Sequence, residues 1–380
     1  AMETSGFDFW IVLSRENNED PIHRTLVTWD MPEARRVSIL AFHRDSATGA
    51  VRKMCVGSQS PEMDKLYENV QKQGESVWEA LARVLQECDP ARIAVDRSVW
   101  SGFCDGLSST LFEQLKDSID PCYCARIEDG EDLTVRWLER VTPLEKKIMK
   151  CFCEVTHAII HYTFSSDFVV PGKTTTTDIE WCMRSIINEL GYRYWFGPDV
   201  DLQRRGSSVS RMFDVTIEPG DLIHCDIGIN GQYVQLHTDM QWVAYILREG
   251  EKQVPQDLQA LLDCGNRFRQ IVMENMHVGK QGNAVFTAAM RQAKAEGIQP
   301  MLYSHPVGTF GHGAGPTIGL YTNQGFVPGT GERTIEEDTC FALELNVYDN
   351  ISCWDGQRVF MYLEENICRA AENDYIDGHQ

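Results

Sequence analysis

Short apolar runs and helical stretches alternate over the first third of the chain. The runs FWIVL, VSILAF and RIAVD have the length of buried strands, and the segments 76–88 and 107–119 place apolar residues at helical spacing. This rhythm predicts a small α/β domain over residues 1–138. A charged segment at 136–150 leads out of it, so we predict a second domain over residues 139–380.

Two pairs of helices are predicted in the second domain. The first pair begins with a long helix over 144–164 and continues with a helix whose start is marked by Thr177 and Glu180 at capping-box spacing. The second pair covers 255–276 and 283–297. Each pair ends in a glycine-containing turn before a β-rich stretch. This repeated layout hints at an internal duplication.

Four acidic residues stand in the β-rich stretches, within or beside apolar strands. They are Asp226, Asp239, Glu344 and Glu364. The first two belong to a predicted hairpin over 220–245, in which Asn230-Gly231 is the turn signal. A buried carboxylate is costly unless it is paired or bound to a metal.

A glycine-rich stretch adds imidazoles to these acids. Residues 304–319, SHPVGTFGHGAGPTIG, contain two histidines and five glycines. Four carboxylates and an imidazole together predict a site for two divalent ions. Carboxylate-dominated shells suit manganese, iron, cobalt or zinc, and a water between two such ions becomes a nucleophile near neutral pH.

The sequence resembles the pita-bread metalloenzymes, which include methionine aminopeptidase, prolidase, aminopeptidase P and the metal-free creatinase. The resemblance covers roughly residues 140 to 370 and rests on five segments in the family's order: PGKTTTTDI, IEPGDLIHCDIG, GHGAG, FALELNVY and YLEENI. It implies an α+β fold. A C-terminal pita-bread domain would follow a smaller N-terminal α/β domain like that of creatinase and prolidase.

The resemblance also implies roles for individual residues. Two divalent ions, with manganese the first choice, would be held by Asp226, Asp239, His312, Glu344 and Glu364. A metal-bridging hydroxide would attack an amide carbonyl, Glu344 would take and return the proton, and His305 would stabilise the oxyanion. The reaction implied is that of an Xaa-Pro dipeptidase or aminopeptidase, acting on small peptides as a cytoplasmic homodimer.

The resemblance explains why glycines stand beside His312. Gly311, Gly313 and Gly315 would let backbone and substrate approach the metal closely.

The spacing of the two aspartates departs from the family pattern. The family spacing would place the second acid at position 237, where this chain has a histidine. A tight turn at Asn230-Gly231 would put residue 235 opposite Asp226 and leave Asp239 farther off. A wider loop would absorb two inserted residues and return Asp239 to the ligand position, with His237 on the same face of the strand as a substrate contact. We favour the wider loop.

Two accessory histidines of the family are replaced. After GHGAG the chain has an insertion and offers Asn323, and the segment 194–208 offers Arg204 and Arg205 instead of a histidine. A guanidinium grips a carboxylate but does not shuttle protons at neutral pH. Asn323 and Arg204 are therefore predicted to bind substrate.

These replacements keep two other functions open. The same fold could act on a small carboxylated metabolite, through hydrolysis of another C–N bond or through iron-dependent redox chemistry. A binding module without catalysis is the third possibility, although buried acids would then have no reason to persist.

Composition narrows the partners further. The 380 residues carry a formal net charge of −21, and no basic face is available for a nucleic acid. No run of eighteen apolar residues occurs, so no membrane span is predicted. The thirteen cysteines are scattered and lack zinc-finger spacing, which indicates mostly reduced, buried thiols in a cytosolic protein. The first residues lack a signal-peptide pattern.

Overall fold

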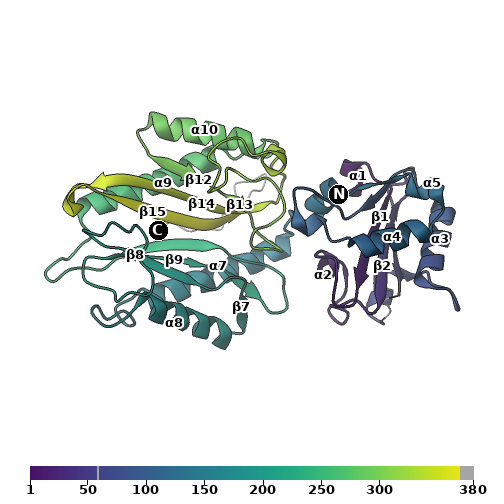
Figure 1. Ribbon diagram of the computed structural model, residues 1–380, viewed down its shortest axis with the longest axis horizontal. Coiled ribbons are helices and arrows are strands. Elements are labelled where there is room, and N and C mark those ends of the chain that lie inside the picture. Colours follow the sequence, from purple (N-terminus) through teal and green to yellow (C-terminus); the bar gives the residue numbers. More distant parts are fainter. Residues whose placement is uncertain (58–59, 369–380) are drawn as a thin grey trace. The chain divides into compact units, whose positions relative to one another are not determined.

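The computed structural model describes residues 1–57 and 60–368 of the chain. It divides the chain into two compact units, Ala1–Leu138 and Glu139–Gln380 (Figure 1). Both units combine helices with sheets, which confirms the predicted α+β class. None of the described helices has the length and apolar character needed to cross a membrane.

The first unit is built on a mixed six-stranded sheet of order β4-β3-β2-β1-β5-β6. Its strands are β1 (Phe9–Arg15), β2 (Val37–Arg44), β3 (Val51–Val56), β4 (Glu68–Asn69), β5 (Ile93–Val95) and β6 (Ile127–Asp129). Its helices are α1 (Met2–Ser5), α2 (His23–Leu26), α3 (Val77–Cys88), α4 (Ser109–Ser118), α5 (Pro121–Cys124) and α6 (Glu131–Leu138). Apolar residues of α3 and α4 pack against one face of the sheet, on side chains such as Phe9, Ile11 and Ile39.

The second unit carries a seven-stranded sheet of order β12-β14-β15-β11-β9-β8, with β13 paired to β14. Its strands are β8 (Asp199–Gln203), β9 (Leu222–Ile227), β11 (Met240–Tyr245), β12 (Pro300–Leu302), β13 (His305–Pro306), β14 (Cys340–Ile351) and β15 (Gln357–Cys368). Two short strands, β7 (Tyr192–Tyr194) and β10 (Ile229–Gly231), pair with each other. The helices are α7 (Pro143–Thr163), α8 (Thr176–Glu189), α9 (Gln256–Asn275) and α10 (Gly282–Ala295).

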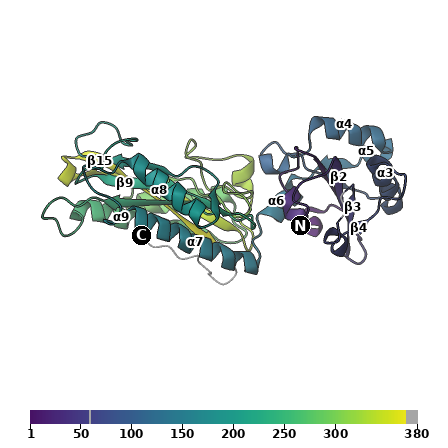
Figure 2. The same ribbon diagram turned by 90° about the horizontal axis from the view of Figure 1, so that it is seen from below.

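The second unit consists of two halves with the same make-up. In one half α7 and α8, which run alongside each other in Figure 2, pack on β8 and β9; in the other, α9 and α10 pack on β14 and β15. The helices contact Cys225 and Leu345, which neighbour Asp226 and Glu344 along their strands. Because side chains alternate along a strand, both acids point to the face that the helices leave uncovered.

The start of α8 differs from the sequence prediction. Thr175 caps the helix, with Asp178 as its reciprocal partner. The hydroxyl of Thr177 donates instead to Asp214. The capping box therefore lies two residues before the predicted one, because the pattern of a threonine followed three residues later by a polar acceptor occurs twice in this segment.

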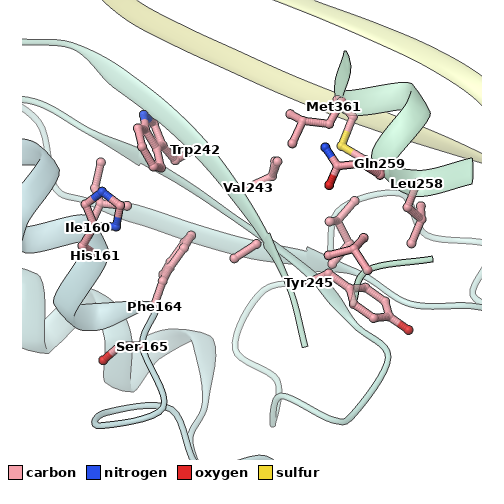
Figure 3. A pocket seen from close by; sticks show the side chains of 14 residues that line it. Ile160, His161, Phe164, Ser165, Trp242, Val243, Tyr245, Leu258, Gln259 and Met361 are labelled. Carbon is pink, nitrogen blue, oxygen red and sulfur yellow. The ribbon is translucent and has the colours of Figure 1, made fainter. Parts of the chain in front are cut away.

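The two halves meet at a seam between β11 and β15. In the described sheet one register pair, Gln241 with Glu364, joins these strands. Near this seam a pocket of about 500 Å³ lies between α7 and α9, with Trp242 of β11 and Met361 of β15 in its wall (Figure 3). The wall contains His161 but none of the predicted ligands.

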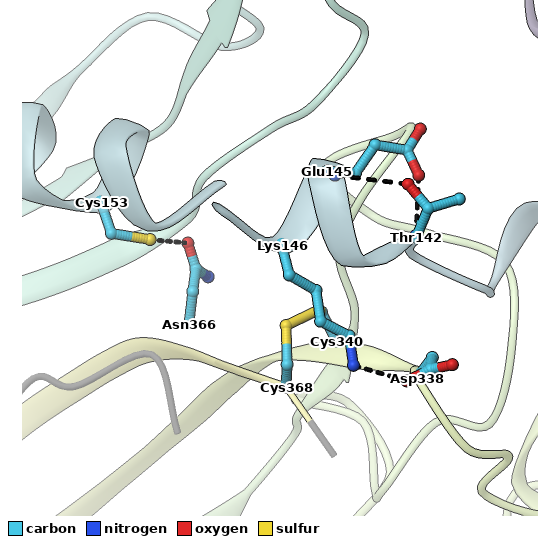
Figure 4. The surroundings of a disulfide bond; sticks show 8 residues. All are labelled: Thr142, Glu145, Lys146, Cys153, Asp338, Cys340, Asn366 and Cys368. Atoms are coloured by element: carbon cyan, nitrogen blue, oxygen red, sulfur yellow. Dashed lines mark hydrogen bonds and ion pairs between the residues drawn. A yellow bond between two sulfur atoms is a disulfide. The ribbon is translucent and has the colours of Figure 1, made fainter. Parts of the chain in front are cut away.

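A disulfide joins β14 and β15 at the end of their ladder. Cys340 and Cys368 are register partners and are bonded, close to Lys146 near the start of α7 (Figure 4). The other eleven cysteines are free. Four of them are buried, five are partly buried and two, Cys122 and Cys151, are exposed, so the prediction of mostly buried thiols holds only in part. The sequence did not indicate this pair, because it unites segments from separate strands of the sheet.

We expect loss of this disulfide to lower stability without disturbing the sheet. Cross-linking two positions that are 28 residues apart restricts the unfolded chain, an effect worth about 3 kcal/mol. Cys368→Ala should therefore lower the melting temperature, and a reductant should lower that of the unchanged protein to the same value. Cys151→Ala, which changes a free and exposed cysteine, is the control. Equal melting temperatures for all three proteins would contradict the prediction.

Candidate functional site

The strand register settles the position of Asp239. Asp226 pairs with Gln241, and Asn230 pairs with His237, so the connection between the strands runs through residues 231–236. The tight-turn alternative is therefore wrong and the wider loop is confirmed. Asn230 and Gly231 belong to β10, where they pair with β7 instead of forming a turn.

Four side chains form a row across the uncovered face of the sheet. Asp226 of β9 faces Gln241 of β11, which in turn faces Glu364 of β15, and Glu364 faces Glu344 of β14. Asp239 precedes β11 on the same face as Gln241. The row crosses the seam. With Asp239 included, each half of the unit contributes two acids to the face.

Two histidines complete the cluster. His305 is in β13, opposite Ala342 of β14, and His312 lies in the glycine-rich loop that follows. Their rings are 4.6 Å apart and nearly perpendicular. The ligand atoms lie within 4.8 Å of one another in each of three overlapping groups: Asp239 with His305 and His312, His305 with Glu344 and Glu364, and Asp226 with Asp239 and Glu364.

His305 occupies the centre of this cluster. Its Nε2 is 3.5 Å from Asp239, 3.7 Å from Glu364 and 3.9 Å from Glu344. Its Nδ1 lies 3.0 Å from the carbonyl oxygen of Pro306, which can only accept, so Nδ1 carries the proton. In the neutral ring Nε2 is then unprotonated, and its lone pair points toward the acids. This is the arrangement of a metal-binding histidine, in which Nε2 accepts; the role of His305 at an oxyanion stays a prediction.

The electrostatics of the cluster favour protonated acids and neutral imidazoles. Burial raises the pKa of Glu344 to about 8 and that of Asp226 to about 6. Burial and the neighbouring carboxylates raise the pKa of Asp239 and of Glu364 well above the ordinary value. Burial, with the neighbouring His312, lowers the pKa of His305 to about 4. Without cations, these acids cannot all be ionised together.

The donor set fits divalent metal ions. Buried atoms without a hydrogen-bond partner include Asp226 Oδ1, His305 Nε2 and Glu364 Oε1, three atoms that each carry a lone pair. Buried acceptors of this kind are costly unless a cation or proton donor satisfies them. Carboxylate oxygens with imidazole nitrogens are the ligands that manganese, iron, cobalt and zinc share.

Gln241 is a member of the site that the sequence analysis did not name. Its Nε2 donates to Glu344 at 2.5 Å and to Glu364 at 2.9 Å, so one amide holds an acid from each of two strands. Its Oε1 contacts Nε2 of His224, whose Nδ1 contacts Asp201. The available signal was its position two residues after Asp239, on the same face of the strand.

Removing the Gln241 amide should weaken metal binding. In Gln241→Leu the two acids lose their common donor and the geometry it imposes. Loss of such an outer contact typically lowers metal affinity by roughly 10 to 100-fold. Calorimetric titration with manganese would measure it. Gln203→Leu is a matched control, since the side chain of buried Gln203 bonds, within the described part of the chain, to backbone groups of Phe360. Unchanged affinity in Gln241→Leu would contradict this role.

A second unpredicted residue fixes the backbone at Asp239. Asn366 of β15 accepts from the backbone N–H of Asp239 at 3.1 Å and donates to its carbonyl oxygen at 3.0 Å. The amide side chain replaces ladder hydrogen bonds where β11 and β15 separate. It thereby holds Asp239 against the strand that carries Glu364.

Trp195 forms the wall beside His312. Its Nε1 donates to the carbonyl oxygen of Thr238 at 2.9 Å, and its ring meets that of His312 edge to face at 5.1 Å. A Cβ on Gly311 would lie 2.2 Å from the indole. Gly311 therefore makes room for Trp195, a requirement that the sequence analysis did not foresee. Similarly, a Cβ on Gly313 would lie 2.9 Å from the oxygen of Pro306.

His237 lies next to the cluster and outside it. Its backbone N–H donates to Gly308, its Nδ1 contacts the same carbonyl oxygen at 3.1 Å, and its ring lies 6.2 Å from that of Trp195. Burial lowers the pKa of His237. The neutral ring lines the same wall as Trp195.

The remaining predicted substrate residues are bound elsewhere. Arg204 follows β8 and forms a two-pronged ion pair with Asp221. Arg205 pairs with Asp355. Asn323 is exposed in its loop and donates to the carbonyl oxygen of Phe326. None of the three joins the described acid and histidine cluster, and the roles of Arg204 and Asn323 as substrate contacts stay predictions.

Arg211, and not Arg204 or Arg205, is the arginine that lies near Asp226. It pairs with Asp201 and lies 3.3 Å from Asp199, the register partner of Asp226. Its guanidinium also lies 5.6 Å from the ring centre of Tyr362.

Comparisons with known proteins identify the family and the fold of the chain. Residues 147–368 match the profile of metallopeptidase family M24. A search of curated protein sequences finds no significant match. Among solved structures, an X-Pro aminopeptidase from Thermotoga maritima is similar, with 13% identity over 99% of this chain and 96% of that chain and a TM-score of 0.68.

Two other solved structures are similar over nearly their whole length. An Xaa-Pro dipeptidase from Bacillus anthracis is 15% identical over 99% of this chain and 94% of that one, with a TM-score of 0.65. Prolidase from Pyrococcus furiosus is 11% identical over 100% of this chain and 98% of that one, with a TM-score of 0.64. At these identities the likeness establishes a shared fold.

Proposed function

The chain belongs to metallopeptidase family M24, and from this premise we propose that it is a dinuclear metal-dependent hydrolase acting on Xaa-Pro peptides. The observation that carries the proposal is the convergence of four carboxylates and two imidazoles from six separate segments on one point of the sheet. The structural neighbours that are Xaa-Pro peptidases support the choice of substrate.

The ligand roles follow the geometry of the row. Asp226 and Glu364 would help to hold the ions, because they lie on either side of Gln241 and each leaves a buried oxygen without a partner among the described residues. Asp239 would hold one ion, and His312 with Glu344 the other. His305 joins this set as a ligand, because its Nε2 is deprotonated and central.

In the proposed reaction the ions would activate the water and the carbonyl group, and a side chain would transfer the proton. Two divalent ions bound here would polarise the scissile carbonyl and lower the pKa of a water molecule so that it attacks near neutral pH. Glu344 would take the proton from that water and return it to the leaving amine. Its Oε1 accepts from Gln241, so Oε2 is the atom that carries the proton. In the metal-free cluster burial raises the pKa of Glu344 to about 8, so this carboxyl would release its proton when cations bind and could then act as the base.

Aromatic rings near the cluster support an apolar substrate residue such as proline. Tyr303 and Tyr321 meet edge to face at 5.2 Å, and Asn346 donates to the hydroxyl of Tyr303 at 3.0 Å. Tyr303 directly precedes Ser304 and His305, and Tyr362 lies two residues before Glu364 on the same strand face. Such rings pack against the CH groups of a pyrrolidine ring.

The decisive experiment is hydrolysis of Ala-Pro and Leu-Pro by metal-loaded protein. Protein reconstituted with manganese or cobalt should release proline, chelation should stop the release, and Ala-Ala should be cleaved more slowly. Metal analysis should find two ions per chain. Absence of turnover with every metal tested would overturn the peptidase proposal.

A second candidate function rests on one of the three ligand groups. Asp239, His305 and His312 form a set of two imidazoles and one carboxylate, which is the ligand set of many mononuclear iron enzymes. Redox chemistry on a small carboxylated metabolite is therefore the alternative. One bound iron per chain, with oxygen uptake that requires a small-molecule substrate, would favour it over hydrolysis.

A further inference from the structure

The first unit contains a pocket that takes no part in the cluster described above. The pocket has a volume of about 550 Å³, which is the size of a small-molecule site. It lies on the face of the sheet opposite α3 and α4. Trp10 and Phe42 are register partners in its floor, and Lys53 is the partner of Phe42 on the next strand.

Four aromatic rings line this pocket and are held in place. The ring of Phe42 lies 5.2 Å from Trp10 and 6.0 Å from Tyr67, and Trp10 lies 6.4 Å from Trp137. The polar atoms of three of these rings are bound to the protein: Trp10 Nε1 to Asp96, Tyr67 OH to Leu26 and Trp137 Nε1 to Thr25. The lining therefore offers ring surfaces and not ring hydrogen-bond donors. A flat apolar body suits it.

Two cations share this lining without a described acid as partner. Arg44 and Lys53 both border the pocket, and no ion pair joins either to a carboxylate of the described chain. The buried Nε of Arg44 has no hydrogen-bond partner among the described atoms. Glu3 is the acid in the lining, and it is exposed.

Cationic side chains without an acidic partner are unexpected in a chain as acidic as this one. The net charge is −21, and neighbouring arginines of the same unit, such as Arg52 and Arg92, are paired with glutamates. An unpaired buried guanidinium donor is costly unless an anion reaches it. Guanidinium groups bind carboxylates in a two-pronged geometry.

We propose that this pocket binds a small aromatic carboxylate, with its ring against Trp10, Phe42 and Trp137 and its carboxylate between Arg44 and Lys53. The aromatic lining supplies the apolar contact and the cations supply the selectivity for an anion. The site is independent of the acid cluster and of the reaction proposed for it.

Calorimetry on the full-length protein tests the proposal. The probes are 1-naphthoate and its neutral analogue 1-naphthalenemethanol, each titrated with and without EDTA. We expect 1-naphthoate to bind at least tenfold more tightly than the alcohol, with the same affinity in both buffers. Equal affinities for the two probes would overturn the proposal. Binding that EDTA abolishes would also overturn it, because it would place the carboxylate at the metal cluster.

Variants locate the bound carboxylate. Arg44→Met should weaken 1-naphthoate at least tenfold and leave the alcohol unchanged, whereas Arg35→Met, which alters an exposed arginine outside the lining, should change neither. Lys53→Met, at an exposed position, provides a second test should Arg44→Met fail to fold, with an expected loss of at least threefold. Full 1-naphthoate affinity in either pocket variant would overturn the assignment.

Discussion

Glu364→Gln is expected to lower kcat/KM for metal-dependent hydrolysis by about a thousandfold or more. Glu364 stands at the seam, accepts from Gln241 and contributes an unpartnered buried oxygen to the proposed site for two ions. Glutamine has nearly the same shape but carries no charge, so at least one ion should be lost together with its activation of water. A thousandfold loss corresponds to about 4 kcal/mol of transition-state stabilisation.

The neighbouring glutamate provides the control for this variant. Glu365 points to the helix side of the same strand, where it accepts from Trp242 at 2.6 Å and contacts His157 at 3.0 Å. Both glutamates are almost fully buried. Glu365→Gln should therefore leave the metal content unchanged. Retention of two ions and full activity in Glu364→Gln would refute the proposed site.

The stability of the metal-free protein is expected to fall as pH rises from about 4 to 8. Glu344 and Asp226 have folded-state pKa values of about 8 and about 6, above the ordinary values near 4 that apply in the unfolded chain. Over this window the unfolded chain has released protons that the folded chain still holds. The stability that these groups contribute is therefore complete below about pH 4 and is lost as pH rises through the two folded-state values.

Metal ions should reverse this loss. Cations take the place of the retained protons, so their affinity rises with pH. At a thousandfold excess over Kd they add about 4 kcal/mol, or about 10 °C in melting temperature for a domain of this size. Thermal unfolding with EDTA and with manganese, at intervals from pH 5 to 9, would show a difference that widens with pH.

A variant separates the cluster from other titrating groups. Glu344→Gln removes the proton with a pKa near 8, so the melting temperature of the metal-free variant should depend less on pH than that of the unchanged protein. If the two metal-free proteins show the same pH dependence between pH 5 and 8, Glu344 does not retain its proton in the folded state.

The sequence predicted the positions of the acids better than their partners. Asp226, Glu344 and Glu364 interrupt apolar strands, and an interruption of this kind is visible in a linear pattern. Gln241 and Asn366 are also polar residues in apolar strands, but amides are common in sheets and carry no charge that demands an explanation. Their roles follow from the folded chain, in which the register places Gln241 opposite Glu364 and the side chain of Asn366 bonds to the backbone of Asp239.

Residues distant in sequence from the cluster were the hardest to predict. Trp195 approaches His312 because Gly228 and Gly311 leave space for its indole, and no local pattern connects these three positions. Conversely, Arg204 was selected because it lies near the expected segment, but the strand directs it to Asp221. The position of a residue along the sequence can show which strand it belongs to, but it does not show which end of that strand lies at the site.

The single register pair at the seam has a mechanical consequence. The two halves of the second unit share one rung of backbone pairing between β11 and β15, and acids from both halves face each other across it. As pH rises and these acids ionise without cations, their mutual repulsion is expected to push the halves apart, whereas bound cations would hold them together. The ions would therefore cross-link the two halves in addition to their chemical role. Without them, the seam between β11 and β15 is expected to open and to expose these strands to proteases.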